Sequence, residues 1–276
     1  MFKSTLIIFF AIFLFFACSK KNKEEVLAKP SEKELVTQIY KEGIENLKRG
    51  DSFYASKKFK EAESLLPQSE WAAKSALMTG YSLYSINFYS DSIFNLERYI
   101  KNYPADKNIP YAHYLIGMCY FEQILDEKKD MNPLLLAKEK FKFISLNFPE
   151  TDYAIDAKFK MDLIQDQLAA KEMYVARYYM QTEKWIPAIN RFKKVVEDYE
   201  DTIFVEEALH RLVEIYYRIG LTAEAKKIAA ILGYNYKSSE WYKRSYIVFN
   251  KDYREINFEK DKEDSLIKSA IKKLFQ

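Results

Sequence analysis

The amino-acid sequence predicts an all-α protein, a helical solenoid of about five helix hairpins. Glycine and proline are scarce, at 6 and 7 of 276 residues, which disfavours a β-sandwich or barrel because those folds need many turn residues. A second observation is a short pattern of a small residue, an apolar residue and a proline that recurs with unchanged internal spacing. The 20 Phe and 22 Tyr residues need extensive packing surface, so we expect order everywhere except near the ends.

The recurring pattern places an apolar residue four positions after a small residue and a proline twelve positions after it. The five sets are Ala55, Phe59 and Pro67; Ser92, Leu96 and Pro104; Ala137, Phe141 and Pro149; Ala188 and Phe192 with Glu200; and Ala225 and Ala229 with Lys237. A second small position precedes the first by twelve residues, at Gly43, Gly80 and Ala176, with Val213 as a larger substitute. In the third unit this position is Gly117, twenty residues before Ala137.

This pattern resembles the tetratricopeptide repeat, a helix-turn-helix unit of 34 residues. The resemblance implies a right-handed solenoid. In such a unit the two helices cross closely at the two small residues, and the apolar residue fills the groove against the next hairpin. The proline ends the second helix. We therefore expect the following small residues to be buried at helix crossings: Ala55, Gly80, Gly117, Ala137, Ala176 and Ala188.

Capping residues predict where individual helices begin. Ser31 and Glu34 have the spacing of a capping box at the start of the first helix. Asn132 followed by Pro133 predicts an N-cap and the first helical position, and Pro187 falls in the first turn of a later helix, where a missing N–H costs little.

Two departures from regular spacing predict insertions. From Pro104 to Ala137 there are 33 residues and from Pro149 to Ala188 there are 39, whereas the other equivalent intervals are 25. We expect a long loop around Asp126 to Asn132 in the third unit. In the fourth unit we expect an extended first helix, roughly Thr151 to Thr182, that projects beyond the stack. No linker-like stretch separates the repeats, so residues 31–245 are predicted to form one continuous solenoid, followed by a partly helical tail at 246–276.

The first 17 residues have the pattern of an export signal. Lys3 precedes an apolar run from Leu6 to Ala17, and twelve apolar residues are too few to span a bilayer, which needs about 20. The sequence from Phe15 to Cys18 resembles a lipobox, although Phe15 stands where Leu is usual and Phe16 is larger than the common residue. The resemblance implies a signal peptide at 1–17, lipid on Cys18 and a tether at 18–30. The alternative is an ordinary signal peptide with an incidental cysteine.

The remaining composition favours no catalytic chemistry. The 43 Lys and Arg residues nearly balance 40 Asp and Glu, whereas a nucleic-acid binder is expected to be clearly basic. Cys119 and His113 are predicted to be structural residues of the core. Glu206, His210 and Glu214 share a helix face, but a metal site needs more ligands with recognisable spacing, so we interpret them as a surface charge cluster, with Glu206-Glu207 as solvated charges. No GxSxG, GxGxxG or P-loop pattern occurs. We therefore expect no enzyme, no cofactor and no metal.

Binding is what a helical repeat does well, because stacked hairpins expose a long concave surface lined by their first helices. Tyr40, Tyr81, Tyr84 and Tyr114 lie on predicted first helices and are candidates to present rings to an extended peptide. The alternative is that most of these rings pack between helices.

Two stretches carry a closer resemblance. One begins Val175-Ala176-Arg177-Tyr178-Tyr179, continues through Trp185, Ala188, Asn190 and Arg191, and ends with Asp198 to Thr202; the other runs from Pro149 to Ala154. Together with the lipobox and repeats, they resemble the BamD family, lipoproteins that work with the barrel insertase BamA. The resemblance covers nearly the whole mature chain.

The resemblance to the BamD family implies a lipid-anchored scaffold of the β-barrel assembly machinery on the periplasmic face of the outer membrane. Its implied partners are the periplasmic domains of BamA and unfolded outer-membrane β-barrel proteins, with other Bam lipoproteins as further candidates. The amino-terminal repeats would engage substrates and the carboxy-terminal repeats would dock on BamA. Arg191 matches a family arginine implicated in that docking, and Asn190, Tyr178 and Tyr179 belong to the same stretch.

Two other classes of protein share some of these features. A Tol-Pal-associated coordinator of envelope constriction has similar repeats, but it usually lacks a lipobox and carries a coiled coil ahead of the repeats. An enzyme with a helical solenoid, such as a lytic transglycosylase, would need a further catalytic domain, for which no residues remain.

Overall fold

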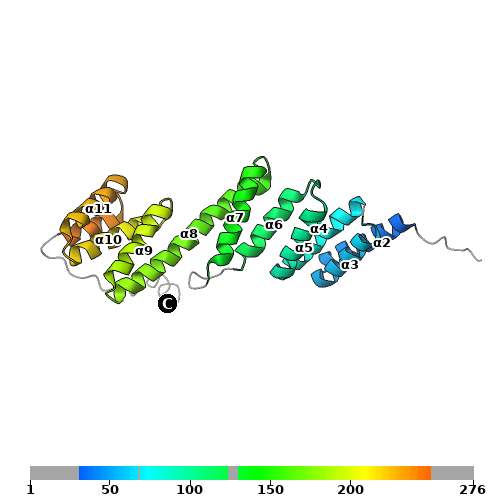
Figure 1. The fold of residues 1–276 in the computed structure, drawn as a ribbon, viewed down its shortest axis with the longest axis horizontal. Coiled ribbons are helices and arrows are strands. Elements are labelled where there is room, and N and C mark those ends of the chain that lie inside the picture. The colour runs from blue at the N-terminus through cyan, green and yellow to red at the C-terminus, as the bar shows by residue number, and fades with distance from the viewer. Residues whose placement is uncertain (1–30, 68, 124–129, 250–276) are drawn as a thin grey trace, which may run out of the picture.

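A computed structural model describes residues 31–67, 69–123 and 130–249, and these residues contain eleven helices and no strand (Figure 1). The helices are α2 (Glu32–Lys48), α3 (Ser52–Leu65), α4 (Glu70–Tyr84), α5 (Tyr89–Asn102), α6 (Ile109–Phe121), α7 (Asn132–Asn147), α8 (Asp152–Gln181), α9 (Trp185–Asp198), α10 (Val205–Arg218), α11 (Thr222–Asn235) and α12 (Glu240–Val248). The expected signal peptide, Cys18 and the tether lie outside the described residues, as does the tail from residue 250.

Consecutive helices pair into five hairpins: α2 with α3, α4 with α5, α6 with α7, α8 with α9, and α10 with α11. The hairpins stack side by side into the elongated molecule of Figure 1, with α12 against α10 and α11. First helices of neighbouring hairpins also contact one another, as α2 with α4, α4 with α6 and α6 with α8. The predicted all-α solenoid of about five hairpins is therefore confirmed.

The small residues of the repeat lie where the two helices of a hairpin cross. A Cβ added to Gly43 would meet Phe59 at 2.7 Å, one added to Gly80 would meet Leu96 at 2.5 Å, and one added to Gly117 would meet Phe141 at 2.7 Å. The apolar residue therefore packs on the glycine of its own hairpin, and it also belongs to the core shared with the next hairpin, as predicted: Leu96 clusters with Ile116 of α6 and Phe141 with Ile164 of α8. All six small residues predicted to be buried at crossings are buried: Ala55, Gly80, Gly117, Ala137, Ala176 and Ala188.

Every second helix ends in one backbone conformation. The residue after the last helical one has φ between −129° and −134° and positive ψ at Leu66, Tyr103, Phe148, Tyr199 and Tyr236. The next residue is the last position of the repeat pattern, and it is proline in the first three units. Proline disfavours the helical conformation in the residue before it. The last two helices end in the same register without a proline, so the packing of the repeat also imposes this ending.

The helix starts agree with the capping prediction in two of three places. Glu34 N–H donates to Ser31 Oγ at 3.3 Å and Ser31 N–H donates to Glu34 Oε2 at 2.8 Å, which is the predicted capping box. Pro187 lies in the first turn of α9, as predicted. Asn132 is the first helical residue of α7 and not its N-cap, which is Met131; the Asn132 N–H donates to Asp130 Oδ1 at 3.1 Å.

The longest helix is α8, whose 30 residues match the predicted extended helix at both ends. It does not project beyond the stack. Its amino-terminal half contributes Ala157, Ile164 and Leu168 to the core built with α6 and α7, and its carboxy-terminal half contributes Met173 and Met180 to the core built with α9 to α12. The long loop expected before α7 falls largely on residues 124–129, outside the described residues.

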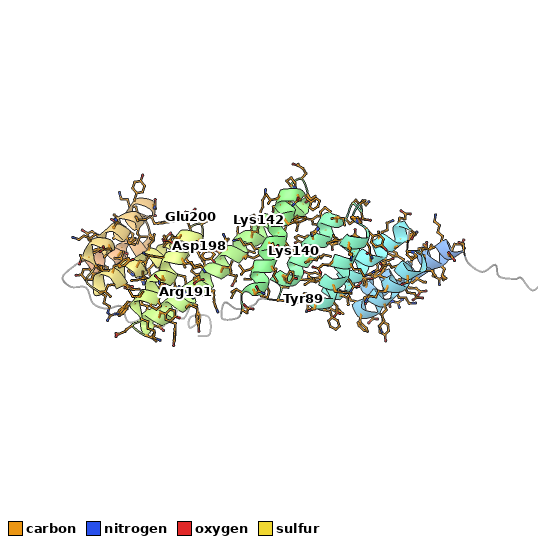
Figure 2. All side chains as sticks on the ribbon, in the orientation of Figure 1. Tyr89, Lys140, Lys142, Arg191, Asp198 and Glu200 are labelled. Atoms are coloured by element: carbon orange, nitrogen blue, oxygen red, sulfur yellow. The ribbon has the colours of Figure 1, made fainter. Side chains whose placement is uncertain are left out.

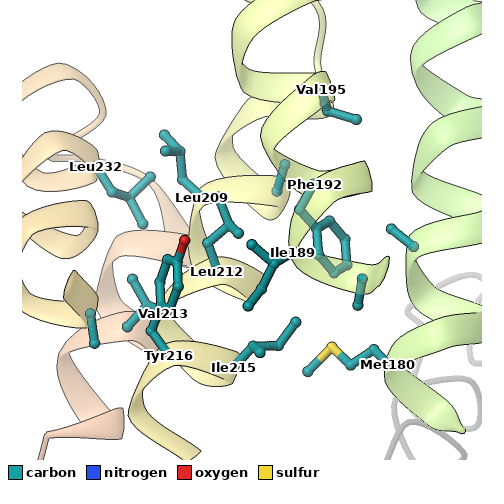
Figure 3. Close-up of a cluster of buried hydrophobic side chains, with 14 of the residues drawn as sticks. Met180, Ile189, Phe192, Val195, Leu209, Leu212, Val213, Ile215, Tyr216 and Leu232 are labelled. Atoms are coloured by element: carbon teal, nitrogen blue, oxygen red, sulfur yellow. The ribbon is translucent and has the colours of Figure 1, made fainter. Parts of the chain in front are cut away.

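Buried apolar side chains form three clusters along the stack. The first core joins α4, α5 and α6, the middle core joins α6, α7 and α8, and the last core joins α8 to α12. In the last core, Phe192 and Ile189 of α9 face Leu209 and Leu212 of α10, and Met180 closes the cluster from α8 (Figure 3). Helix α12 ends at Val248, which is fully buried in the last core and lies beyond the expected solenoid boundary at residue 245.

Candidate binding surfaces

The first helices carry the predicted tyrosines, all of them half-buried. Tyr40 has its ring centroid 5.2 Å from those of both Phe59 and Trp71, so most of its surface contributes to packing between hairpins. The side chain is half-buried, and burial raises its pKa. Tyr40 therefore presents only part of its ring to any ligand.

The other three predicted tyrosines are brought together by a residue that the sequence analysis missed. Tyr81, Tyr84 and Tyr111 all pack on the first core, while Tyr114 packs on the middle core beside Tyr84. Tyr111 also stacks 5.2 Å from Tyr153 of α8. The signal for Tyr111 was its position one helical turn before Tyr114, which places both on one face of α6.

The tyrosine surface is defined as Tyr81, Tyr84, Tyr111, Tyr114 and Tyr153. Burial raises the pKa of Tyr84 to about 12 and raises that of Tyr111. Burial and the hydrogen bond from Tyr114 Oη to Asp156 Oδ2, 2.6 Å long, raise the pKa of Tyr114. The surface thus offers ring edges and hydroxyl groups, which suit an extended chain with both apolar and polar groups.

Arg191, the predicted docking residue, already has a partner within the chain. Its Nη1 donates to Glu172 Oε2 of α8 at 2.7 Å, and Lys194 Nζ donates to Glu172 Oε1 at 2.7 Å. Burial acts to raise the pKa of Glu172, but the two cations outweigh it and hold the pKa below its ordinary value. Arg191 remains 43% exposed, and Figure 2 shows it where α9 lies beside α8. One face of its guanidinium is therefore committed to α8 and another remains open.

The other residues of the predicted docking stretch have unequal exposure. Asn190 is exposed, Tyr178 is 55% exposed, and Tyr179 is half-buried with its ring centroid 5.9 Å from that of Tyr178. The structure thus places the four residues at the junction of α8 and α9. We refer to Tyr178, Tyr179, Asn190 and Arg191 as the junction surface.

The acids and the histidine of α10 are not on the surface, and that interpretation is wrong. His210 is fully buried and Glu214 is 7% exposed, because α12 covers this side of α10. His210 Nδ1 lies 2.8 Å from Ser245 Oγ, and its Nε2 lies 3.5 Å from Glu214 Oε1. Arg211 Nη1 donates to Glu214 Oε2 at 2.9 Å. Burial acts to raise the pKa of Glu214, but the nearby His210 and Arg211 side chains lower it to about 2.

The same network ties α10 to α8. Arg177 Nε donates to Glu207 Oε1 at 3.0 Å, and Arg211 bonds the same carboxylate. Glu206 accepts from Ser239 Oγ, at the start of α12. Glu206 and Glu207 are half-buried and paired, so they are not the solvated charges that were expected. The network therefore links α8, α10 and α12.

The two other residues singled out from the sequence are structural. His113 packs 4.6 Å from the Phe143 ring, and burial lowers its pKa. Cys119 is buried with its Sγ 3.4 Å from Ser92 Oγ, and burial raises its pKa to about 11. Within residues 31–67, 69–123 and 130–249, no group of three or more His, Cys, Asp or Glu residues is arranged to hold a metal ion. None of the helices described there combines the length and apolar character needed to cross a membrane.

The sequence is similar to that of proteins already known. Residues 32–231 match the sequence model of the family YfiO, described as outer membrane lipoprotein. Outer membrane protein assembly factor BamD of Caulobacter vibrioides is 40% identical over 233 residues, covering 84% of this chain and 76% of that one. BamD of Rickettsia prowazekii is 37% identical over 228 residues, covering 83% and 88%. BamD of Neisseria meningitidis serogroup A is 29% identical over 233 residues, covering 81% and 87%.

Proposed function

Because the chain belongs to the BamD family of outer membrane protein assembly factors, a family of YfiO-type outer membrane lipoproteins, we propose that it is a scaffold for the assembly of outer-membrane β-barrel proteins. The observation that carries the proposal is the 40% identity to a named assembly factor across 84% of this chain, because it spans both candidate surfaces. In this function the protein is not an enzyme: it holds an unfolded chain and an insertase close together, which raises the effective concentration of one near the other.

The tyrosine surface is the proposed site for unfolded barrel substrates. Half-buried rings are held rigid by their own packing, so they lose little freedom on binding and offer both apolar area and hydroxyl groups. A photo-crosslinking residue in place of Tyr81, which lies on α4, the first helix of its hairpin, should capture an unfolded barrel protein. The matched control is Phe94 on α5, which is 68% exposed on a second helix. Equal capture at both positions would refute the proposal that the tyrosine surface binds unfolded barrel proteins.

The junction surface is the proposed docking site for the periplasmic domains of the insertase. Tyr178→Ala removes a ring that is 55% exposed, so it should weaken insertase binding with little change in folding. Tyr54→Ala on α3 is the matched control, since that ring is 62% exposed at the other end of the molecule. Affinity measured by calorimetry should fall for the first variant alone. An equal fall for both would indicate a general loss of apolar surface.

The anchor proposed at Cys18 has its own test. Mass spectrometry of the mature amino terminus should find an acylated cysteine, and Cys18→Ser should release the protein from the membrane fraction. A free amino terminus elsewhere would refute the anchor without refuting the scaffold.

The whole proposal is tested by purification of the tagged full chain from its own cells in mild detergent. We expect the barrel insertase among the co-purified proteins, and depletion of this chain should lower the level of outer-membrane barrel proteins. Normal barrel levels after depletion would refute an assembly role.

A further inference from the structure

One face of α8 is apolar and has no partner among the described residues. Ile155, Phe159 and Leu163 stand one helical turn apart and are 65%, 71% and 44% exposed. The opposite face is buried in the middle core through Ala157 and Ile164. A helix that buries one face and exposes a second apolar stripe is typical of an element that packs on both sides.

The stripe is uncovered because the next hairpin is too short. Met173 follows Ile155 by five helical turns, so the two residues point to the same side of α8. Met173 is fully buried in the last core under α9 and α10. Helix α9 has 14 residues against the 30 of α8, about 21 Å against about 45 Å, so it covers only the carboxy-terminal half. Ile155, Phe159 and Leu163 therefore occupy a stacking position that no hairpin fills.

The same side of α8 is acidic. Asp152 and Asp162 are exposed and Asp166 is half-buried, and within the described part of the chain none of the three forms an ion pair. At 100° per residue these carboxylates fall on the arc that carries the apolar stripe. We name Ile155, Phe159 and Leu163, with these three aspartates, the open face of α8.

The end of the chain has a complementary pattern. Between residues 264 and 275, apolar residues recur at helical spacing: Leu266, Ile267, Ala270, Ile271, Leu274 and Phe275. On a helix they would fill one half of the circumference, with Lys268, Lys272 and Lys273 along the borders. The segment thus has an apolar face wide enough to pack on another helix. Its lysines are opposite in charge to the aspartates of the open face.

We propose that residues 264–275 form a helix that docks on the open face of α8. The connection is long enough, because residues 249–263 can extend over about 50 Å, which exceeds the length of α8 of about 45 Å. In this arrangement Ile267, Ile271 and Leu274 cover Phe159 and Leu163, and the lysines of the segment approach Asp162 and Asp166. The docked segment braces α8 between the middle and last cores.

A disulfide test in the full chain examines this contact directly. Phe159→Cys combined with Ile271→Cys should form an intramolecular disulfide under mild oxidation, identified by mass spectrometry of the linked peptides. The control combines Phe94→Cys with Ile271→Cys, because Phe94 is 68% exposed and Phe159 is 71% exposed. We expect at least tenfold more intramolecular product from the first pair. Equal yields, no product, or mainly intermolecular product would overturn the proposal, the last in favour of a second copy.

Charge reversal separates docking from chance collision. Asp162→Lys with Asp166→Lys should lower the yield of the 159–271 disulfide several-fold at low salt, and Lys268→Glu with Lys272→Glu in the same chain should restore it. Hydrogen exchange should protect residues 264–275 in the wild type and not in the aspartate variant. Protection that appears only after addition of vesicles containing anionic phospholipid would overturn the proposal in favour of a membrane-bound segment.

Discussion

Substitution of Arg191 with glutamate disrupts a contact between α8 and α9 within the protein, in addition to any effect on partner binding. Arg191 Nη1 lies 2.7 Å from Glu172 Oε2, and the Glu172 side chain is only 9% exposed. The new carboxylate would face this nearly buried carboxylate. Lys194 Nζ remains 2.7 Å from Glu172 Oε1 and would neutralise part of the added charge.

The expected loss lies between two limits. Removal of one partner from a fully buried ion pair costs about 3–5 kcal/mol, whereas a fully exposed pair contributes about 0.2–1 kcal/mol. Arg191 is 43% exposed, so solvent screens it, and Lys194 still compensates Glu172. We therefore expect Arg191→Glu to lower the free energy of unfolding by about 1–3 kcal/mol. For a chain of this size that corresponds to a fall in Tm of roughly 3–10 °C.

The assay is urea unfolding followed by circular dichroism, with insertase affinity measured on the same samples. Arg191→Met removes the charge and keeps the stem, so its loss of stability should be smaller. Addition of Glu172→Gln to Arg191→Met should recover part of that loss, because no uncompensated carboxylate remains. Wild-type stability of Arg191→Glu would refute the reasoning, and a binding defect in that variant would then belong to the docking surface alone.

Three further outcomes follow from the packing and the buried charges. Gly80→Ala places a Cβ 2.5 Å from Leu96 and should cost about 0.5–2 kcal/mol in urea unfolding, since overpacking outweighs the helix propensity gained; strict additivity with Leu96→Val would contradict this contact. Glu214 has a pKa of about 2 against an ordinary 4.5, so its stabilisation is complete above about pH 4.5 and is lost as the pH falls toward 2. Trp241 fluorescence should report this loosening, and a flat signal in that range would oppose it. Cys119, with a pKa of about 11, should react with iodoacetamide at pH 8 only after unfolding, and rapid native labelling would refute its burial.

The hairpins were predictable because their determinants are local in the sequence. Gly80 with Leu96, and Gly117 with Phe141, are opposite one another in a crossing that the spacing alone defines. The bounds of α8 were predictable for the same reason, since Thr151 and Thr182 flank an interval that no other unit has. Residue types at fixed separation were sufficient for the crossings of small and apolar residues and for the length of α8.

The surroundings of the charged residues were not predictable in this way. Spacing placed Glu214 and His210 on one face of α10, but burial of that face depends on α12, which begins at residue 240. Arg191 is paired with Glu172, 19 residues earlier on another helix, and this pairing depends on the rotation of α9 relative to α8. Such contacts depend on how neighbouring helices are oriented, and a periodic pattern leaves that orientation open.

The two cores carried by α8 have a geometrical relation that is set by a residue count. Each helical residue advances about 1.5 Å and turns about 100°. Removal of one residue between Leu168 and Met173 would therefore rotate the last core about the α8 axis by roughly 100° relative to the middle core. Insertion of seven residues there would return it to within about 20° while lengthening the separation by about 10 Å. A change in the length of α8 therefore keeps the relative orientation of the tyrosine surface and the junction surface only if it amounts to about two helical turns.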